Sequence, residues 1–180
     1  MPEEHASSVA AANPFTNTDV AQILLERGWA AAALLPAQSA WCEHAAAVLG
    51  PQVTDRRGLA DLLGLIFRYD AREILACVES HVVLSRYAAR DVLRLLALLL
   101  LKPAPLDSER FKEIITALKE ALDIRGRELF HPIRLALAGR AGEGELDRVI
   151  LLLDEAAAAA FSTPVKTARE RIIEFCAALD

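Results

Sequence analysis

The fold is decided by residues 121–155, which read ALDIRGRELFHPIRLALAGRAGEGELDRVILLLDE. Gly126 predicts the start of a helix that runs to Ala138 and contains a proline near its beginning. The segment 139–144 holds three glycines and is predicted to be a loop. Apolar residues beyond it recur at helical spacing: Leu146, Val149, Ile150 and Leu153. Two helices joined by a glycine-rich loop are therefore expected here.

The same pattern continues through the rest of the chain and predicts an all-α protein. Its apolar residues are mostly Leu and Ala, which are strong helix formers, and no alternating run of strand length occurs. Asp55 and Asp70 stand where N-caps are expected. We expect about nine helices, including a short one at 29–35 and a long one at 80–101.

Two prolines in the segment 102–108 predict a boundary between two helical subdomains. The first is expected at 18–102 and the second at 103–180. Residues 1–17 are rich in Ala, Ser, Asn and Pro, and are predicted to be a mobile tail.

Net charge and cysteine content indicate which classes of function and location the sequence favours. The formal net charge is −5, so the chain lacks the basic surplus that often marks a nucleic-acid binder. A local basic face on an acidic protein stays possible. Three scattered cysteines give no disulfide framework, and the acidic N-terminus does not resemble a signal peptide. The apolar run Leu95–Leu101 is too short to span a bilayer, so no membrane is expected and the predicted location is the cytoplasm.

No catalytic or metal-binding motif is present, so we expect no enzyme activity, no metal and no cofactor. Cys42 and His44 stand two residues apart and point to different faces of a helix. Glu143 and Glu145 flank a glycine, where nothing fixes the separation of their carboxylates. We interpret Cys42 as a core cysteine, His44 as a surface histidine, and Glu143 and Glu145 as solvated charge.

One segment differs from the acidic rest of the chain. Residues 124–142 contain a single acid, Glu128, against four bases: Arg125, Arg127, Arg134 and Arg140. On a helix, Arg127, His131 and Arg134 share one face, and the glycine loop follows. Arginine forks can grip phosphates or base edges, which indicates a site for a polyanion. The alternative is an ordinary solvated helix face that ends at Gly139.

Residues 121–155 resemble the C-terminal part of bacterial glutamyl-tRNA synthetases. The matching positions occur in the same order and spacing as in that family: Gly126, Leu129-Phe130, Pro132, Arg134, Ala136-Leu137, Gly139, Leu146 and 151–153. A weaker resemblance covers residues 48–67, where a leucine-rich helix ends in a Phe. Together the two stretches extend the resemblance from Asp19 to the C-terminus.

The resemblance implies an all-α cage of two subdomains that grips the anticodon arm of tRNA. It places Arg134 at the arginine of the family motif, and residues 143–146 in the loop and helix start that approach the anticodon bases. Together with the basic helix face, it gives the predicted RNA-binding residues: Arg127, His131, Arg134, Arg140, Glu143, Gly144, Glu145 and Leu146.

The catalytic domain of that family, with its nucleotide-binding signatures, has no counterpart in the chain. The resemblance therefore implies a non-catalytic tRNA-binding module that acts with a separate catalytic subunit. Met1 followed by a tail indicates a stand-alone protein, with a piece of a longer synthetase as the alternative. The chain departs from the family at Ala138, Gly144 and Gln52. The acidic total charge and the missing base near Gln52 favour a second hypothesis: a protein-interaction scaffold that kept the fold and lost the RNA.

Overall fold

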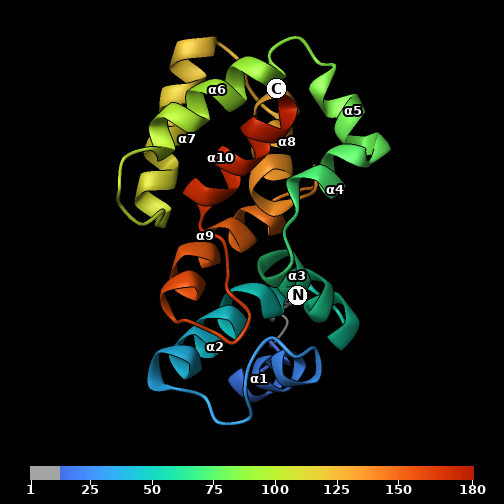
Figure 1. Ribbon diagram of the computed structural model, residues 1–180, viewed down its shortest axis with the longest axis vertical. Coiled ribbons are helices and arrows are strands. Elements are labelled where there is room, and N and C mark those ends of the chain that lie inside the picture. Colours follow the sequence, from blue (N-terminus) through green and yellow to red (C-terminus); the bar gives the residue numbers. More distant parts are fainter. Residues whose placement is uncertain (1–12) are drawn as a thin grey trace, which may run out of the picture.

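The computed structural model describes residues 13–180 and contains ten α-helices and no strand within that range (Figure 1). The helices are α1 (Asn17–Glu26), α2 (Pro36–Leu49), α3 (Arg56–Phe67), α4 (Ala71–Ala76), α5 (Val78–Leu84), α6 (Ala89–Leu100), α7 (Ser108–Leu122), α8 (Arg127–Ala138), α9 (Glu145–Ala158) and α10 (Ala168–Leu179). A 3-10 turn, η1 (Gly50–Gln52), follows α2. The all-α expectation is confirmed.

One end of the molecule is built from α1, α2 and α3 (Figure 1). Helix α1 packs against α2 and α3, and both of these pack against α9. Four aromatic rings form its centre. Trp29 is stacked on Phe67 with 5.2 Å between the ring centroids. Trp41 and Phe161 each meet Phe67 edge-on. Such pairs add to the stabilisation that burial of the rings already gives.

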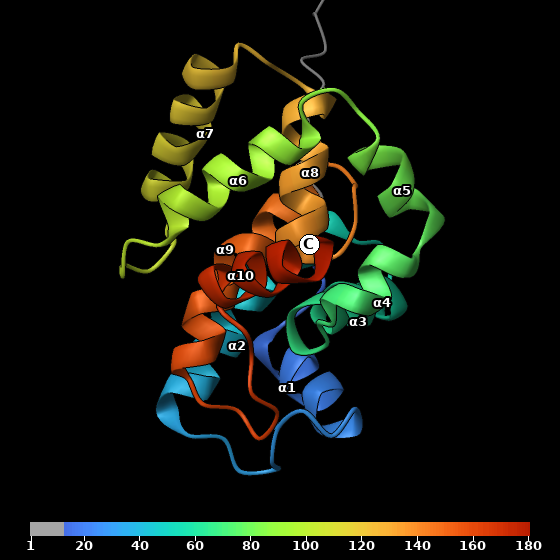
Figure 2. The same cartoon turned by 45° about the horizontal axis from the view of Figure 1, so that its top comes forward.

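The other end contains α4 to α8 and α10. Helix α6 packs against α7, α8 and α10, so it lies at the centre of this group (Figure 2). Its buried side is apolar and its outer side carries arginines and Asp91, as expected for an amphipathic helix. Helices α4 and α5 lie beside α8 and α10 on one flank.

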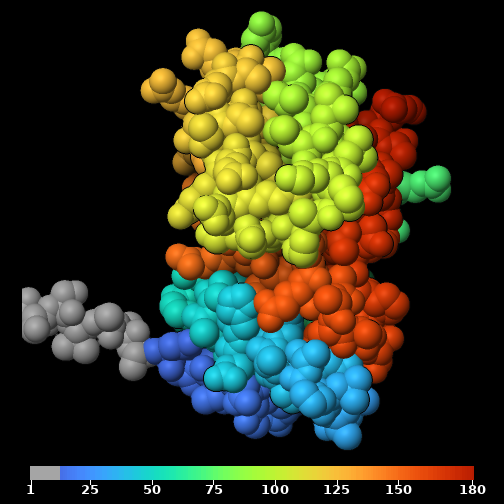
Figure 3. Space-filling view, turned by 90° about the vertical axis from the view of Figure 1, so that its left-hand side faces the viewer, coloured from blue at the N-terminus to red at the C-terminus, as the bar shows by residue number. Residues whose placement is uncertain are grey.

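Helix α9 joins the two ends, because it packs against α2 and α3 as well as against α8. Figure 3 shows it in orange between the cyan α2 and the yellow α7. One continuous hydrophobic cluster runs through the described chain. The predicted division into 18–102 and 103–180 stays a prediction, although α6 lies before that boundary and packs on helices beyond it.

Two helix predictions were wrong. The expected helix at 80–101 is two helices, α5 and α6, separated at residues 85–88, and the expected helix at 29–35 consists of turns and bends. The break at 85–88 contains no proline and depends on packing, because α5 contacts α8 whereas α6 contacts α7, α8 and α10. These contacts outweigh the local helix propensity of the segment. Residues 29–35 directly precede Pro36, which disfavours a helical backbone at Leu35.

The predicted tail falls mostly on residues 1–12, which lie outside the described residues. Its described end is in contact with the protein. The Asn13 side chain donates to the Ala46 carbonyl at 2.8 Å, and Phe15 packs against the core. Thr16 forms a capping box with Asp19 at the start of α1. Across the described range, no helix has both the length and the apolar content to cross a membrane.

Candidate nucleic-acid interface

Helix α8 and the loop after it carry the residues predicted to bind RNA. Gly126 precedes the helix with a φ of 61°, and Gly139 ends it with a φ of 85°. Both values lie in the left-handed region that favours glycine, which confirms the two predicted boundaries. Pro132 lies in the second turn of the helix. The loop then leads into α9 at Glu145.

Arg134 is turned into the protein. Its guanidinium forms a two-pronged ion pair with Asp147, with Nε–Oδ1 at 2.8 Å and Nη2–Oδ2 at 2.9 Å. Nη1 donates to the Gly142 carbonyl at 2.9 Å, and the group lies 4.8 Å from the centroid of the Phe130 ring. The residue is 8% exposed. Arg134 therefore holds the glycine loop and the start of α9 in place, and its charge is matched inside the protein.

Arg127 is exposed on α8, whereas His131 on the same helix is half-buried. The ring atom Nδ1 of His131 lies 2.8 Å from Nη1 of Arg86, which follows α5. Nε2 of His131 is buried, and no partner for it lies in the described part of the chain. Burial, together with the charge of Arg86, lowers the pKa of His131. The neutral imidazole thus accepts a hydrogen bond from Arg86.

The glycine loop carries an exposed charge at Glu143 and is followed by a buried apolar side chain, Leu146. Arg127 and Glu143 face each other at 3.8 Å, and both are exposed. Gly144 is exposed, and Glu145 begins α9, where a carboxylate is favoured by the helix dipole. Leu146 is only 2% exposed and fills the space over Gly142, where an added Cβ would meet its Cδ1 at 2.7 Å.

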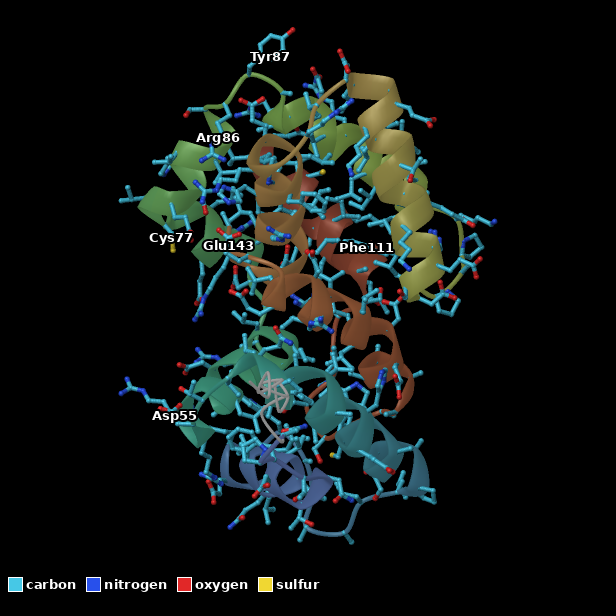
Figure 4. All side chains as sticks on the ribbon, turned by 180° about the vertical axis from the view of Figure 1, so that it is seen from behind. Asp55, Cys77, Arg86, Tyr87, Phe111 and Glu143 are labelled. Carbon is cyan, nitrogen blue, oxygen red and sulfur yellow. The ribbon has the colours of Figure 1, made fainter. Side chains whose placement is uncertain are left out.

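The four predicted basic side chains therefore do not form a single cluster, and this expectation is corrected. Arg127 and His131 lie together, and Figure 4 shows Arg86 and Glu143 near them on the side of α8 that faces α5. Arg134 is enclosed because its fork is matched to Asp147. Arg140 lies elsewhere, in a cleft at the waist of the molecule.

This waist cleft has a volume of about 540 Å³ and lies between the α1–α3 end and the start of α4. Three arginines line it, and each stands at or just beyond the end of a different helix. They are Arg27 after α1, Arg68 after α3 and Arg140 after α8. Within residues 13–180, none of the three forms an ion pair.

The cleft also contains aromatic and acidic groups. Trp29, stacked on Phe67, forms part of its lining, and the Arg27 guanidinium lies 6.0 Å from the Trp29 ring centroid. Asp61, Asp70 and Glu73 line the cleft as well. The Asp70 carboxylate caps α4, because it accepts from the backbone N–H groups of residues 72 and 73. The negative charge of Asp70 is thus partly neutralised by the N-terminus of α4.

Arg27 and Arg68 were missed by the sequence prediction. Each is a single arginine after a helix, with no neighbouring base to mark a cluster. The signal that could have found them is their shared position at a helix end, but only the packing of α1, α3 and α8 brings these ends together.

Among the described residues there is no group of three or more side chains suited to hold a metal. Cys42 is buried, and His44 instead meets Glu155 at 2.7 Å.

Comparisons with known proteins agree with the predicted resemblance. The glutamate–tRNA ligase 2 of Syntrophus aciditrophicus (strain SB) is 26% identical over 118 residues. That alignment covers 66% of this chain and 24% of the ligase, so the chain matches about a quarter of the length of that relative. No solved structure matches. A family model described as an anticodon binding domain matches residues 9–159, and the chain therefore belongs to the anticodon-binding domain family.

Proposed function

We propose that this chain is a non-catalytic module that binds the anticodon arm of a tRNA. Membership of the family and the likeness to a glutamate–tRNA ligase support this class of ligand. The observation that carries the proposal is the waist cleft, where three arginines from three helix ends face one hollow without ion pairs in the described chain.

The mixed charge of the cleft suits unpaired nucleotides better than a duplex backbone. Arginine forks bind phosphates and the acceptor edges of bases. Carboxylates such as those of Asp61 and Glu73 can accept from the exocyclic amino groups of bases. RNA loops present their bases in this way, and most sequence-specific RNA recognition uses them. An anticodon loop is therefore a suitable occupant.

We assign two kinds of role to the predicted residues. Arg140 in the cleft and Arg127 on α8 would contact RNA directly, and the loop 143–145 would approach it from the side. His131 would act through Arg86, to which its Nδ1 is bonded. Arg134 and Leu146 would act indirectly, because both are buried and hold that loop. An interaction with a separate synthetase catalytic subunit belongs to the same proposal, because the aligned part of the ligase is about a quarter of its length.

A binding titration tests the proposal. Fluorescence anisotropy would follow labelled tRNA, and a stem-loop of its anticodon arm, at 50 mM and 200 mM salt. Loss of one phosphate contact in Arg140→Ala should weaken binding and reduce the salt slope by about 0.7–0.9. Arg169→Ala removes an equal charge from an exposed position in a different hollow, beside Lys102 and Ile173, and should change little.

The two possible failures are clear. Absence of binding by the wild-type protein at 50 mM salt would reject the tRNA-binding role and leave the interaction scaffold. Equal effects of Arg140→Ala and Arg169→Ala would reject the cleft as the contact surface, while leaving a general electrostatic attraction.

A further inference from the structure

Arg171 of α10 is a charged side chain at the centre of the protein. It is 0% exposed, and no carboxylate of the described chain forms an ion pair with it. Its guanidinium donates only to backbone carbonyls and lies 4.6 Å from the centroid of the Tyr69 ring. The acceptors are Lys166 at 3.0 Å, Leu65 at 2.9 Å, Leu137 at 3.0 Å and Ile66 at 2.6 Å.

Three of these carbonyls belong to the last turns of two helices. Leu65 and Ile66 are near the end of α3, and Leu137 is near the end of α8. Carbonyls in the last turn have no partner within their own helix and carry the negative end of its dipole. A buried cation therefore satisfies two helix ends at once. The Tyr69 hydroxyl adds to this junction, because it donates to the Ala136 carbonyl at 2.5 Å.

The same two helix ends carry two of the three cleft arginines. Arg68 is the residue directly after α3, and Arg140 follows α8 by two positions. The Arg171 guanidinium thus sets the separation of the backbone segments from which both side chains enter the cleft. Arg27, the third, follows α1, and none of the carbonyls bonded to Arg171 belongs to that helix.

We infer that Arg171 is a positioning residue for RNA binding, which acts by holding the ends of α3 and α8, and with them Arg68 and Arg140, at a fixed distance. The inference rests on the proposed function. It adds a residue that lies outside the matched range 9–159 and would never touch the RNA itself.

Arginine suits this junction better than lysine. Its planar fork offers five donors in fixed directions, whereas an ammonium offers three and spans a smaller distance. Burial lowers the pKa of Arg171 to about 10, so the group stays charged at neutral pH. A lysine at this position would keep the charge and lose the simultaneous contact with both helix ends.

Double-mutant cycles with tRNA as the probe test the inference. Arg171→Lys should retain the helical CD spectrum and weaken tRNA binding about tenfold, the size of coupling found within one hydrogen-bond network. Combination with Arg68→Ala or Arg140→Ala should weaken binding less than the product of the single effects. When Arg171→Lys is combined with Arg27→Ala, the loss of tRNA affinity should equal the product of the two single losses, because Arg27 is not held by Arg171.

Two controls separate positioning from a general loss of stability. Phe175→Leu changes another fully buried residue of α10 and should lower stability without the pattern of coupling to Arg68 and Arg140. Tyr69→Phe removes the hydroxyl bond to the Ala136 carbonyl and keeps the ring under the guanidinium. Tyr69→Phe should give a smaller loss of tRNA affinity with the same coupling pattern. It replaces Arg171→Lys in the test if that variant does not fold.

The outcomes distinguish the two proposals. If wild-type protein binds tRNA and Arg171→Lys binds equally well, the positioning role is rejected and the proposed function stands. Equal coupling of Arg171 to Arg27 and to Arg140 would also reject it, because a general structural effect would then explain the loss. If the wild-type protein fails to bind, the proposed function itself is rejected and this inference falls with it.

Discussion

Arg134 and Asp147 form a nearly buried ion pair between α8 and α9, whereas Arg127 and Glu143 form an exposed one a few residues away. The side chains of the first pair are 10% and 24% exposed, and those of the second 76% and 69%. Removal of one partner from a buried pair leaves an unmatched charge, but an exposed pair loses almost nothing. The two arginines therefore give a matched comparison at the level of single residues.

We predict that Arg134→Ala lowers the free energy of unfolding by about 3 kcal/mol. Arg127→Ala should lower it by less than about 0.5 kcal/mol. Urea unfolding followed by circular dichroism would measure both. A loss for Arg134→Ala as small as that for Arg127→Ala would show that the Asp147 contact does not hold the loop.

The lowered pKa of His131 predicts how the stability of the folded protein depends on pH. Its pKa in the folded protein lies below the ordinary value of 6.5, because of burial and then the charge of Arg86. The unfolded chain therefore binds the proton more readily, and stability is lost as the pH falls from 6.5 toward the folded-state pKa. Above pH 6.5 this group should cause no further change.

His131→Asn tests that dependence, because an amide oxygen can still accept from Arg86 but does not titrate. Urea midpoints at pH 7.5, 6.5 and 5.5 should fall more steeply for the wild-type protein than for the variant. Parallel curves for the two proteins would mean that other groups cause the acid sensitivity.

At the level of elements, two glycines flank the loop between α8 and α9: Gly139 ends α8, and Gly144 precedes α9. Gly139 has a φ of 85°, and an added Cβ would lie 3.4 Å from Cδ1 of Ile74. Gly144 has a φ of −62°, with nothing within 4 Å of an added Cβ. The same substitution at the two positions should therefore have opposite consequences.

We predict that Gly139→Ala costs about 1–2 kcal/mol of stability, because an L-residue is strained in the left-handed region. It should also weaken tRNA binding through Arg140. Gly144→Ala should be neutral, or stabilising by about 0.5 kcal/mol, because it restricts the unfolded chain. Thermal unfolding of both variants would check this, and a stable Gly139→Ala protein would contradict it.

Sequence signals predicted the starts of α3 and α4, which depend on local chemistry. Asp55 and Asp70 are N-caps in the structure, since their carboxylates accept from backbone N–H groups within three residues. The break at 85–88 carries no such signal, because it depends on which helices α5 and α6 pack against. For the same reason the burial of Arg134, and the meeting of Arg68 with Arg140 in one cleft, could not be predicted from spacing along the chain.

For the whole molecule, the bridge formed by α9 predicts cooperative unfolding. Trp41 donates to the Leu152 carbonyl of α9 at 3.1 Å, and one hydrophobic cluster continues past it. Trp29 and Trp41 both belong to the α1–α3 end, whereas circular dichroism reports on every helix. Urea transitions measured by tryptophan fluorescence and by circular dichroism should therefore coincide. Two separate midpoints would instead support independent subdomains divided near residue 102.

The most direct test of the waist cleft is the salt dependence of tRNA binding by a protein that lacks all three of its arginines. The logarithm of the affinity should fall with the logarithm of salt concentration for the wild-type protein. In the Arg27→Ala, Arg68→Ala, Arg140→Ala triple variant, the magnitude of that slope should be smaller by about 2–3. An unchanged slope and an unchanged affinity would contradict the central claim, because the RNA would then be held at some other surface.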